Sequence, residues 1–245
     1  MLAIIGGSGL TQLASMEVIR REVARTPFGE PSGALSFGKL CNRQVVFLAR
    51  HGYGHTIPPH QVNYRANLWA LKQAKADAVV SVASVGGIRP DLSPGAVVIP
   101  HQILDYTWGR KSTFFEGVEQ PVRHIDFTHP YDPGLRNRLL AAARSAGESA
   151  VDGGVYAAMQ GPRLETAAEV NRLERDGADL VGMTGMPEAA LARELELPYA
   201  AINVVANYAA GRAASSGGIH FDSIEQVLRE AMGRVHAILE ALCHP

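Results

Sequence analysis

Four short groups of glycine and polar residues have the chemistry of an anion-binding site, and each follows an apolar run of the chain. They are Gly6-Gly7-Ser8-Gly9, Arg50-His51-Gly52, Ala83-Ser84-Val85-Gly86-Gly87 and Met183-Thr184-Gly185-Met186-Pro187-Glu188. Glycine lets backbone N–H groups approach an anion closely, a hydroxyl donates a hydrogen bond, and arginine offers paired donors that match phosphate oxygens. Together the groups predict a phosphate-binding pocket assembled from separate turns.

Each group also has a plainer explanation. A glycine-rich turn after a strand is often only a turn, and Arg50 could be a solvated residue beside a capping His51. Thr184 could cap the helix that starts near Pro187, and Met183 could fill the core. The occurrence of four such groups at strand ends favours the binding site.

Other kinds of site fit the same residues less well. The loop at residues 6–9 lacks the third glycine of a dinucleotide-binding loop, since Gln12 stands there, and no Gly-Lys-Ser/Thr follows it. His51, His55 and His60 could suggest zinc. The glycines and prolines among them, however, prevent the helix that would bring His51 and His55 to one face. We therefore expect neither a metal ion nor a dinucleotide cofactor.

Two further groups could recognise an organic ligand. The loop Gln160-Gly161-Pro162-Arg163-Leu164-Glu165-Thr166 places an apolar side chain beside a carboxylate. Leu164 could pack on a sugar or a base while Glu165 accepts a ring N–H. Asn207, near the end of an apolar run, presents both an amide donor and a carbonyl acceptor, although asparagine is also common where strands turn.

The elements that would position these groups alternate along the chain. Apolar runs predict strands at residues 2–5, 45–49, 78–83, 96–99, 155–159, 180–184 and 200–206, and helical patterns occupy residues 64–75, 135–146, 167–175, 188–196 and 223–242. This alternation predicts a single α/β domain over residues 1–245 with a largely parallel sheet. Ligands of such sheets bind beyond the carboxyl ends of the strands, where the polar groups stand. Residues 209–218 could be a mobile lid or a linker.

The composition excludes several classes of partner. The 245 residues are 47% hydrophobic and 19% charged with a net charge of −1, and their Lys and Arg residues are scattered. We therefore expect a small-molecule partner, with no nucleic acid and no membrane. Two cysteines, Cys41 and Cys243, are too few for a disulfide framework and fit a cytoplasmic protein. The apolar residues 1–5 are too few for a signal or membrane helix.

The same groups, in their order along the chain, resemble those of a known family. The matching residues are Ile4-Ile5-Gly6-Gly7-Ser8-Gly9-Leu10, Thr26-Pro27-Phe28-Gly29, Leu48-Ala49-Arg50-His51-Gly52, His55-Thr56-Ile57, Val62-Asn63-Tyr64-Arg65-Ala66-Asn67, Gly161-Pro162-Arg163 and Met183-Thr184. They make the chain similar to the trimeric purine nucleoside phosphorylases, and within them to the methylthioadenosine phosphorylase branch. The resemblance implies a single-domain α/β nucleoside phosphorylase fold whose mixed, distorted, partly barrel-like central sheet is flanked by helices. This replaces the open, largely parallel sheet.

The resemblance also implies roles for individual residues. Phosphate, the co-substrate, would be held by Ser8, Arg50, His51, Ala83, Ser84 and Thr184. Met183 would lie under the ribose and Leu164 against the base, and the further substrate-binding candidates are His55, Tyr208, Ala209, Ile224 and Leu228. His124 corresponds to a loop that reaches the adjacent subunit's sugar site in a homotrimer.

Two departures from the methylthioadenosine branch indicate the substrate. That branch has Asp-x-Asp where this chain has Asn207-Tyr208-Ala209, and the resemblance to 6-oxopurine enzymes makes Asn207 and Glu165 the catalytic, base-binding pair. Ile224 stands where those enzymes have a histidine for the 5′-hydroxyl, so an apolar methylthio group fits better. We expect phosphorolysis of a hypoxanthine-like 5′-methylthionucleoside in purine salvage. Methylthioadenosine or inosine and guanosine as substrates, a nucleoside hydrolase and a non-catalytic nucleoside-binding module are the alternatives.

Overall fold

The computed structural model describes residues 1–118 and 121–244. The strands in these ranges are β1 (Leu2–Gly6), β2 (Glu17–Glu22), β3 (Leu35–Leu40), β4 (Arg43–Ala49), β5 (Ala78–Gly87), β6 (Val97–Ile99), β7 (Gln102–Asp105), β8 (Val151–Asp152), β9 (Val155–Ala158), β10 (Leu180–Gly182) and β11 (Tyr199–Tyr208). The α-helices are α1 (Tyr64–Gln73), α2 (Pro133–Ser145), α3 (Ala167–Arg175), α4 (Gly185–Glu194) and α5 (Phe221–Cys243). Two 3-10 helices, η1 (Pro59–Gln61) and η2 (Ala213–Ser215), lie between them.

Every strand and helix expected from the sequence is present, with ends that differ by a few residues, and four strands were missed. The missed strands are β2, β3, β7 and β8. All six residues of β2 are exposed, so it lacks the apolar run that marks a buried strand. A glycine interrupts β3, and β7 and β8 have only four and two residues.

The sheet is mixed, as the family resemblance implied. Its strands run in the order β2-β3-β4-β1-β5-β10-β9-β7, and a branch from β5 leads through β11 and β6 to β8. β1 pairs in parallel with β4 and β5, and β11 is parallel to β5, whereas β10 is antiparallel to β5. A register shift between Val205 and Asn207 distorts β11 near its end. The first expectation of a largely parallel sheet therefore holds for the central strands β4, β1, β5 and β11, while the sheet as a whole is mixed.

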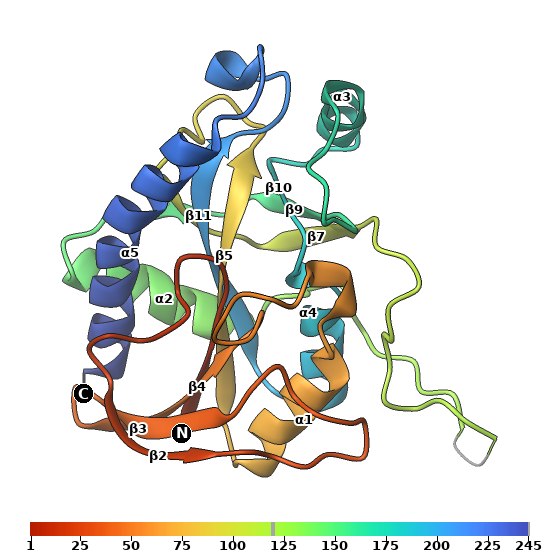
Figure 1. Cartoon of the computed structure of the whole chain (residues 1–245), viewed down its shortest axis with the longest axis vertical. Helices are drawn as coiled ribbons and strands as arrows, with labels where there is room; N and C mark the ends of the chain where they lie inside the picture. The colour runs from red at the N-terminus through yellow and green to blue at the C-terminus, as the bar shows by residue number, and fades with distance from the viewer. Residues whose placement is uncertain (119–120, 245) are drawn as a thin grey trace.

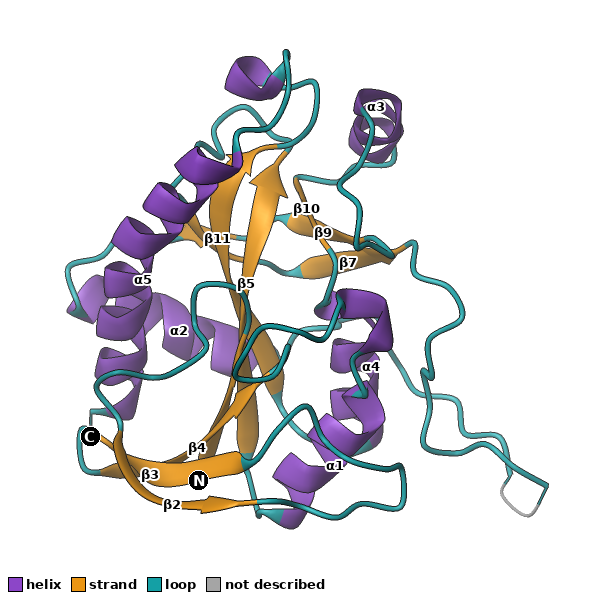
Figure 2. Cartoon of the chain, in the orientation of Figure 1, coloured by secondary structure: helices purple, strands orange, loops and turns teal. Residues whose placement is uncertain are grey.

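Helices cover both faces of the sheet. In Figures 1 and 2, α2 and α5 lie on one side of the long strands β5 and β11, and α1 and α4 lie on the other. Residues of β1 alternate between two buried clusters: Leu2 and Ile4 pack with residues of α2 and α5, while Ala3 and Ile5 pack with those of α1 and α4. Burial on both faces explains why the central strands have continuous apolar sequences.

Helix caps fix the chain next to the strand ends. Thr166 and Glu169 form a capping box at the start of α3, so the loop before it enters the helix at a defined point. Asn63 accepts a hydrogen bond from the backbone N–H of Ala66 at 3.1 Å and begins α1. These caps position the segments that precede them, which lie beside the cavity described next.

Candidate active site

The carboxyl ends of β1, β4, β5, β10 and β11 surround a cavity of about 540 Å³. It is lined by residues 7–8, 50–51, 55–59, 83–86, 162, 164–165, 181–184, 206–207 and 209, and at one side by residues 219, 221, 224 and 228 near the start of α5. The cavity therefore lies where the sequence predicted a ligand site, beyond the carboxyl ends of the strands.

Most of the predicted site residues meet in this one cavity. Those that line it are Ser8, Arg50, His51, His55, Ala83, Ser84, Leu164, Glu165, Met183, Thr184, Asn207, Ala209, Ile224 and Leu228. Tyr208 does not line it and instead offers its backbone carbonyl to Asn207. His124 is exposed on the segment between β7 and α2, outside the cavity of its own chain.

The first turn of the cavity wall needs glycine at position 7. A Cβ atom there would stand 2.7 Å from both the Nη1 atom of Arg50 and the carbonyl oxygen of Val82. The backbone at Gly7 thus runs directly against the Arg50 guanidinium. Ser8 follows, with its Oγ 3.4 Å from Nε2 of His55. The turn can offer backbone N–H groups and a hydroxyl to an anion, as predicted.

Arg50 is fully buried and paired with a carboxylate. Its Nε and Nη2 donate to the two carboxylate oxygens of Glu188 at 2.7 and 2.9 Å. Nη2 also donates to Ser81 Oγ at 2.6 Å, and Nη1 donates to the Val82 carbonyl at 3.1 Å. The paired donors expected for phosphate are therefore held by Glu188. One N–H of Nη1, beside Gly7, has no protein partner among the described residues and can face an anion.

The charge state of Arg50 is fixed by this pair. Burial alone would lower the pKa of the guanidinium, but the Glu188 carboxylate more than offsets burial and raises the pKa above its ordinary value. The phenol of Tyr199 donates to the same carboxylate at 2.8 Å. Arg50 is thus a permanently charged group held in one orientation behind the cavity wall.

His51 is a neutral imidazole in this setting. Burial first, and then the charge of Arg50, lower the pKa of His51 to about 4. Its Nδ1 lies 2.8 Å from the carbonyl oxygen of Ile57, which can only accept, so Nδ1 carries the proton. Nε2 therefore has a lone pair, which can accept a hydrogen bond from a protonated phosphate oxygen.

Thr184 and Ser84 add hydroxyl groups from the ends of β10 and β5. Thr184 is buried and precedes α4, yet its side chain makes no capping hydrogen bond. Met186 has non-helical backbone angles, so the regular part of α4 begins beyond it. The Thr184 hydroxyl is therefore not used as a helix cap, and Ser84, which is half-buried, lines the same cavity.

The base-binding candidates stand at the ends of β9 and β11. Leu164 and Glu165 are half-buried, and burial raises the pKa of the Glu165 carboxyl. The Nδ2 atom of Asn207 donates to the Tyr208 carbonyl at 2.7 Å. This bond orients the Asn207 amide and leaves its second N–H and its carbonyl oxygen for a ligand.

The side of the cavity formed by α5 is apolar. Phe221, Ile224 and Leu228 are spaced three and four residues apart, so they lie on one face of the helix, and Ile219 precedes them. Phe221 is 69% exposed. This face can take up an apolar substituent of a ligand.

Ile219, Phe221 and Glu188 are among the residues that the structure places in or behind the site and to which the sequence analysis gave no role. Ile219 and Phe221 line the cavity, and Phe221 could have been found because it shares the helical spacing of Ile224 and Leu228. Glu188 was quoted in a motif without a role. A charged arginine at the end of a buried strand requires a carboxylate partner, but the sequence does not say which one.

The described residues form neither a bilayer-spanning helix nor a group of side chains that could hold a metal ion. Within residues 1–118 and 121–244, no helix has the length and apolarity needed to cross a membrane. The same residues bring no three His, Cys, Asp or Glu side chains together as a metal site would require.

The sequence matches a family model over nearly its whole length. The model is that of the Phosphorylase superfamily, and it matches residues 1–244. A probable S-methyl-5′-thioinosine phosphorylase of Pseudomonas syringae pv. tomato is 56% identical over 237 residues, which are 97% of this chain and 96% of that protein. A 6-oxopurine nucleoside phosphorylase of Pyrococcus furiosus is 43% identical over 246 residues, covering 98% of this chain and 91% of the relative.

A solved structure has the same fold. Methylthioadenosine phosphorylase from Schistosoma mansoni, in complex with adenine, superposes with a TM-score of 0.94 at 32% identity. The match covers 99% of this chain and 90% of that one. The mixed sheet and its flanking helices are thus those of a nucleoside phosphorylase fold.

Proposed function

The chain belongs to the Phosphorylase superfamily, and we propose that it cleaves S-methyl-5′-thioinosine with inorganic phosphate as co-substrate. The products are hypoxanthine and S-methyl-5-thioribose 1-phosphate. The names of the bacterial and archaeal relatives support both the 6-oxopurine base and the phosphorolytic reaction. The proposed reaction needs phosphate as co-substrate and no cofactor.

One observation carries the choice of substrate: the amide of Asn207 and the apolar face of α5 line the same cavity. An amide can donate to O6 of a 6-oxopurine and accept from a protonated N7, while Glu165 accepts from a ring N–H. A 5′-hydroxyl placed against Ile224 and Leu228 would lose its hydrogen bonds with water, whereas a methylthio group would not. The cavity therefore fits a 6-oxopurine with an apolar 5′ group.

In the proposed reaction, phosphate lies at the Gly7 turn, beside Arg50 and Thr184. One phosphate oxygen forms a bond to C1′ of the sugar from the face opposite the base, while the C1′–N9 bond breaks and its electron pair stays on the purine. The sugar becomes positively charged in the transition state. The phosphate anion, held by fixed donors, stabilises this charge before it completes the bond. No covalent enzyme intermediate is needed.

The leaving purine becomes negatively charged as the bond breaks. N7 takes up a proton from solvent as the bond breaks, so Asn207 would donate to O6 and accept from the new N7–H, while Glu165 would hold the opposite edge of the ring. These hydrogen bonds strengthen as charge moves onto the base, so they accelerate the bond-breaking step rather than only binding the substrate. Met183 lies beside Thr184 and would contact the ribose between base and phosphate.

The substrate assignment is tested by measuring kcat/KM for methylthioinosine, methylthioadenosine and inosine, each with saturating phosphate. We expect methylthioinosine to have the largest value. A preference for inosine would identify an ordinary 6-oxopurine nucleoside phosphorylase, and a preference for methylthioadenosine would contradict the role of Asn207. Binding of methylthioinosine without product formation would identify a non-catalytic binding protein.

The base-reading role is tested by restoring the carboxylates of the 6-aminopurine enzymes. Asn207→Asp with Ala209→Asp should raise activity on methylthioadenosine relative to methylthioinosine, because a carboxylate accepts from a 6-amino group but cannot donate to O6. Paired kcat/KM values of the double variant and the wild type give the ratio. An unchanged ratio would show that Asn207 does not select the base.

Assembly and location are further parts of the proposal. The chain would act as a homotrimer in the cytoplasm, in purine salvage, with the exposed loop that carries His124 reaching the sugar site of the next subunit. Sedimentation velocity gives the number of subunits. Asn207→Ala and His124→Ala should each be nearly inactive alone, and mixing the two chains should restore activity if His124 acts across the interface.

A further inference from the structure

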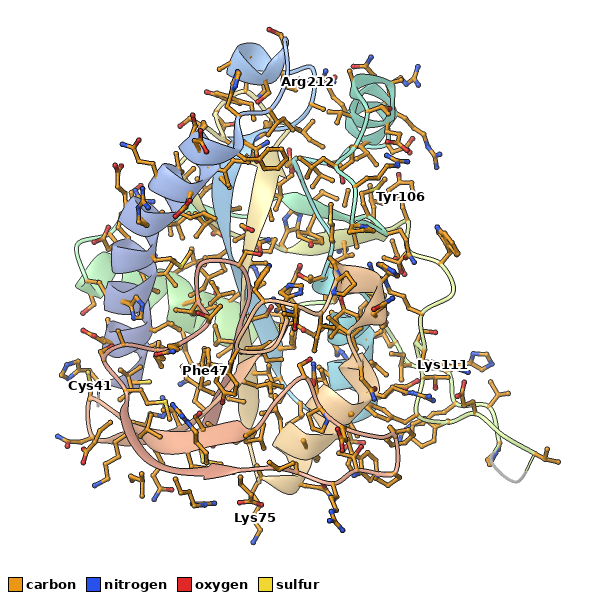
Figure 3. All side chains as sticks on the ribbon, viewed as in Figure 1. Cys41, Phe47, Lys75, Tyr106, Lys111 and Arg212 are labelled. Atoms are coloured by element: carbon orange, nitrogen blue, oxygen red, sulfur yellow. The ribbon has the colours of Figure 1, made fainter. Side chains whose placement is uncertain are left out.

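Arg110 binds segments from three different parts of the chain. It lies five residues beyond the end of β7 and directly before Lys111, which Figure 3 labels. Its Nη1 donates to the carbonyls of Met183 and Met186 at 2.8 and 2.6 Å. Its Nη2 donates to the carbonyls of Gln160 and Met159 at 2.8 and 3.2 Å.

Every acceptor around the Arg110 guanidinium is neutral. Nε donates to Oε1 of Gln160 at 3.2 Å, and Nη1 also lies 3.3 Å from the phenolic oxygen of Tyr64. Within residues 1–118 and 121–244, no carboxylate lies at ion-pair distance from Arg110. A half-buried cation that uses its donors on backbone carbonyls, without an ion pair, holds the backbone itself.

Two of the segments that Arg110 holds lead directly into the cavity. Met159 and Gln160 precede the loop with Leu164 and Glu165, which we assign to the base. The second segment, residues 183–186, contains Thr184, assigned to phosphate. Arg110 therefore connects the base-binding loop to the phosphate-binding turn.

The two segments also touch each other. Gly161 has a φ of +60°, and a Cβ atom at this position would overlap the thioether of Met183. The base loop therefore packs against the residue that we place under the ribose. Any change in the spacing of the two segments would move base, sugar and phosphate relative to one another.

Tyr64 extends the connection to a third side of the cavity. Its hydroxyl donates to the carbonyl of Pro59 at 2.9 Å, and Pro59 lines the cavity. Burial raises the pKa of Tyr64, so the phenol keeps its proton and its oxygen can accept from Arg110. Arg110 thus lies at the centre of a network that includes the segment after His51.

We propose that Arg110 is a positioning residue for phosphorolysis: its guanidinium sets the separation between the base-binding loop and the phosphate-binding turn. This inference rests on the proposed function. Arg110 itself touches no substrate atom in this role. Since a misplacement of reacting groups by about 1 Å can cost about 100-fold in rate, loss of Arg110 should lower kcat more than it weakens the binding of either ligand.

The experiment compares Arg110→Met with a matched control, Arg136→Met. Arg136 also holds backbone carbonyls, those of Pro100 and Ile99 at 2.7 and 3.0 Å, and in addition pairs with Asp152 at 2.6 Å, but it lies on α2, outside the cavity. Both substitutions remove a guanidinium from backbone carbonyls and keep an unbranched side chain. Arg110→Lys, which retains the charge and three donors, serves as the conservative variant.

Two measurements are made on each full-length variant. Steady-state kinetics on methylthioinosine gives kcat and the KM values for nucleoside and phosphate. Hydrogen exchange of the ligand-free protein reports the opening of residues 159–166 and 183–188. For Arg110→Met we expect a fall in kcat of about 100-fold, smaller changes in both KM values, and faster exchange in both segments together. Arg110→Lys should recover part of kcat, and Arg136→Met should show neither effect.

The outcomes separate the inference from the proposed function. A wild type that does not cleave methylthioinosine would refute the proposed function, while hydrogen exchange still decides whether Arg110 holds the two segments. Unchanged exchange in Arg110→Met, or faster exchange with an unchanged kcat, would overturn the positioning role. A kcat loss equal to that of Arg136→Met would also overturn it, because general destabilisation would then explain the effect.

Discussion

The two ends of the cavity are built differently. At the end proposed to bind phosphate (the phosphate end), Arg50, His51 and Thr184 are buried, and Arg50 and His51 are fixed by hydrogen bonds from inside the protein. At the end proposed to bind the nucleoside (the nucleoside end), Leu164, Glu165 and Asn207 are only half-buried, and the apolar face of α5 includes the exposed Phe221. The charged and imidazole groups of the phosphate end are thus part of the core, whereas several side chains of the nucleoside end are accessible to solvent.

This difference indicates how the reaction and its specificity are divided. Substitutions at the phosphate end should affect folding and every substrate alike, because in the proposed function the same buried groups form the core and hold the nucleophile. Substitutions at the nucleoside end should leave the fold intact and change which nucleoside reacts. The following variants test this division, starting with the largest expected effect.

Glu188→Gln should damage both stability and phosphate binding. It leaves the buried Arg50 charge without its carboxylate, and breaking a buried pair costs roughly 3–5 kcal/mol of unfolding free energy. We expect that loss in urea unfolding, together with a raised KM for phosphate. Arg50→Met with Glu188→Leu should recover stability but not phosphate affinity. If Glu188→Gln has the same unfolding free energy as the wild type, the buried Arg50–Glu188 pair does not stabilise the fold, which contradicts this account of the phosphate end.

Asn207→Ala should lower turnover while leaving stability nearly unchanged. The side chain is half-buried and bonds only to a neighbouring carbonyl among the described residues, so little folding energy depends on it. Loss of a hydrogen bond to developing charge costs about 100- to 1,000-fold in kcat. Single-turnover rates with methylthioinosine measure this effect. An unchanged rate would remove Asn207 from the mechanism.

His51 should make the stability depend on pH. Its pKa is about 4 in the folded chain and 6.5 in the unfolded one, so between these values only the unfolded chain binds the proton. Stability is therefore highest above pH 6.5 and falls, by up to about 3 kcal/mol, as the pH drops toward 4. Urea unfolding at pH 7 and pH 4.5 measures the difference, which should be smaller in His51→Asn. Equal differences in both proteins would contradict a neutral, buried His51.

Ile224→His should have the smallest effect and change only specificity. A histidine on the apolar face of α5 could pair with a 5′-hydroxyl, so the ratio of kcat/KM for inosine to that for methylthioinosine should rise about tenfold. The melting temperature should stay within a few degrees of the wild type, because Ile224 lies at the edge of the core. A ratio that does not move would mean that the 5′ group lies elsewhere.

The sequence predicted which residues of the phosphate end lie together better than it predicted the contacts behind them. Continuous apolar runs are visible in a linear sequence, and their ends meet in an α/β sheet, so Ser8, Ser84 and Thr184 could be assigned to one site. The partner of Arg50 could not be assigned, because Glu188 is 138 residues away and only folding brings the two together. Arg110 was missed because its acceptors are mostly backbone carbonyls. Every residue has such a carbonyl, so the sequence does not mark the acceptors.

At the nucleoside end, prediction depended on the family resemblance. Ile224 and Leu228 were identified, whereas Phe221, on the same face, was not. The strands β2 and β3 were missed because exposed or glycine-containing strands lack an apolar run. Tyr208 was expected in the site but lies outside its lining, because successive side chains of an extended chain point to opposite sides and its neighbours Asn207 and Ala209 line the cavity.

The most direct test is to follow methylthioinosine cleavage with and without phosphate, and to identify the sugar product by ³¹P NMR. Our account predicts that hypoxanthine forms only when phosphate is present, with one S-methyl-5-thioribose 1-phosphate for each hypoxanthine. Equal cleavage in phosphate-free buffer, with free methylthioribose as the product, would show that water is the nucleophile and would contradict the role of the buried anion pocket.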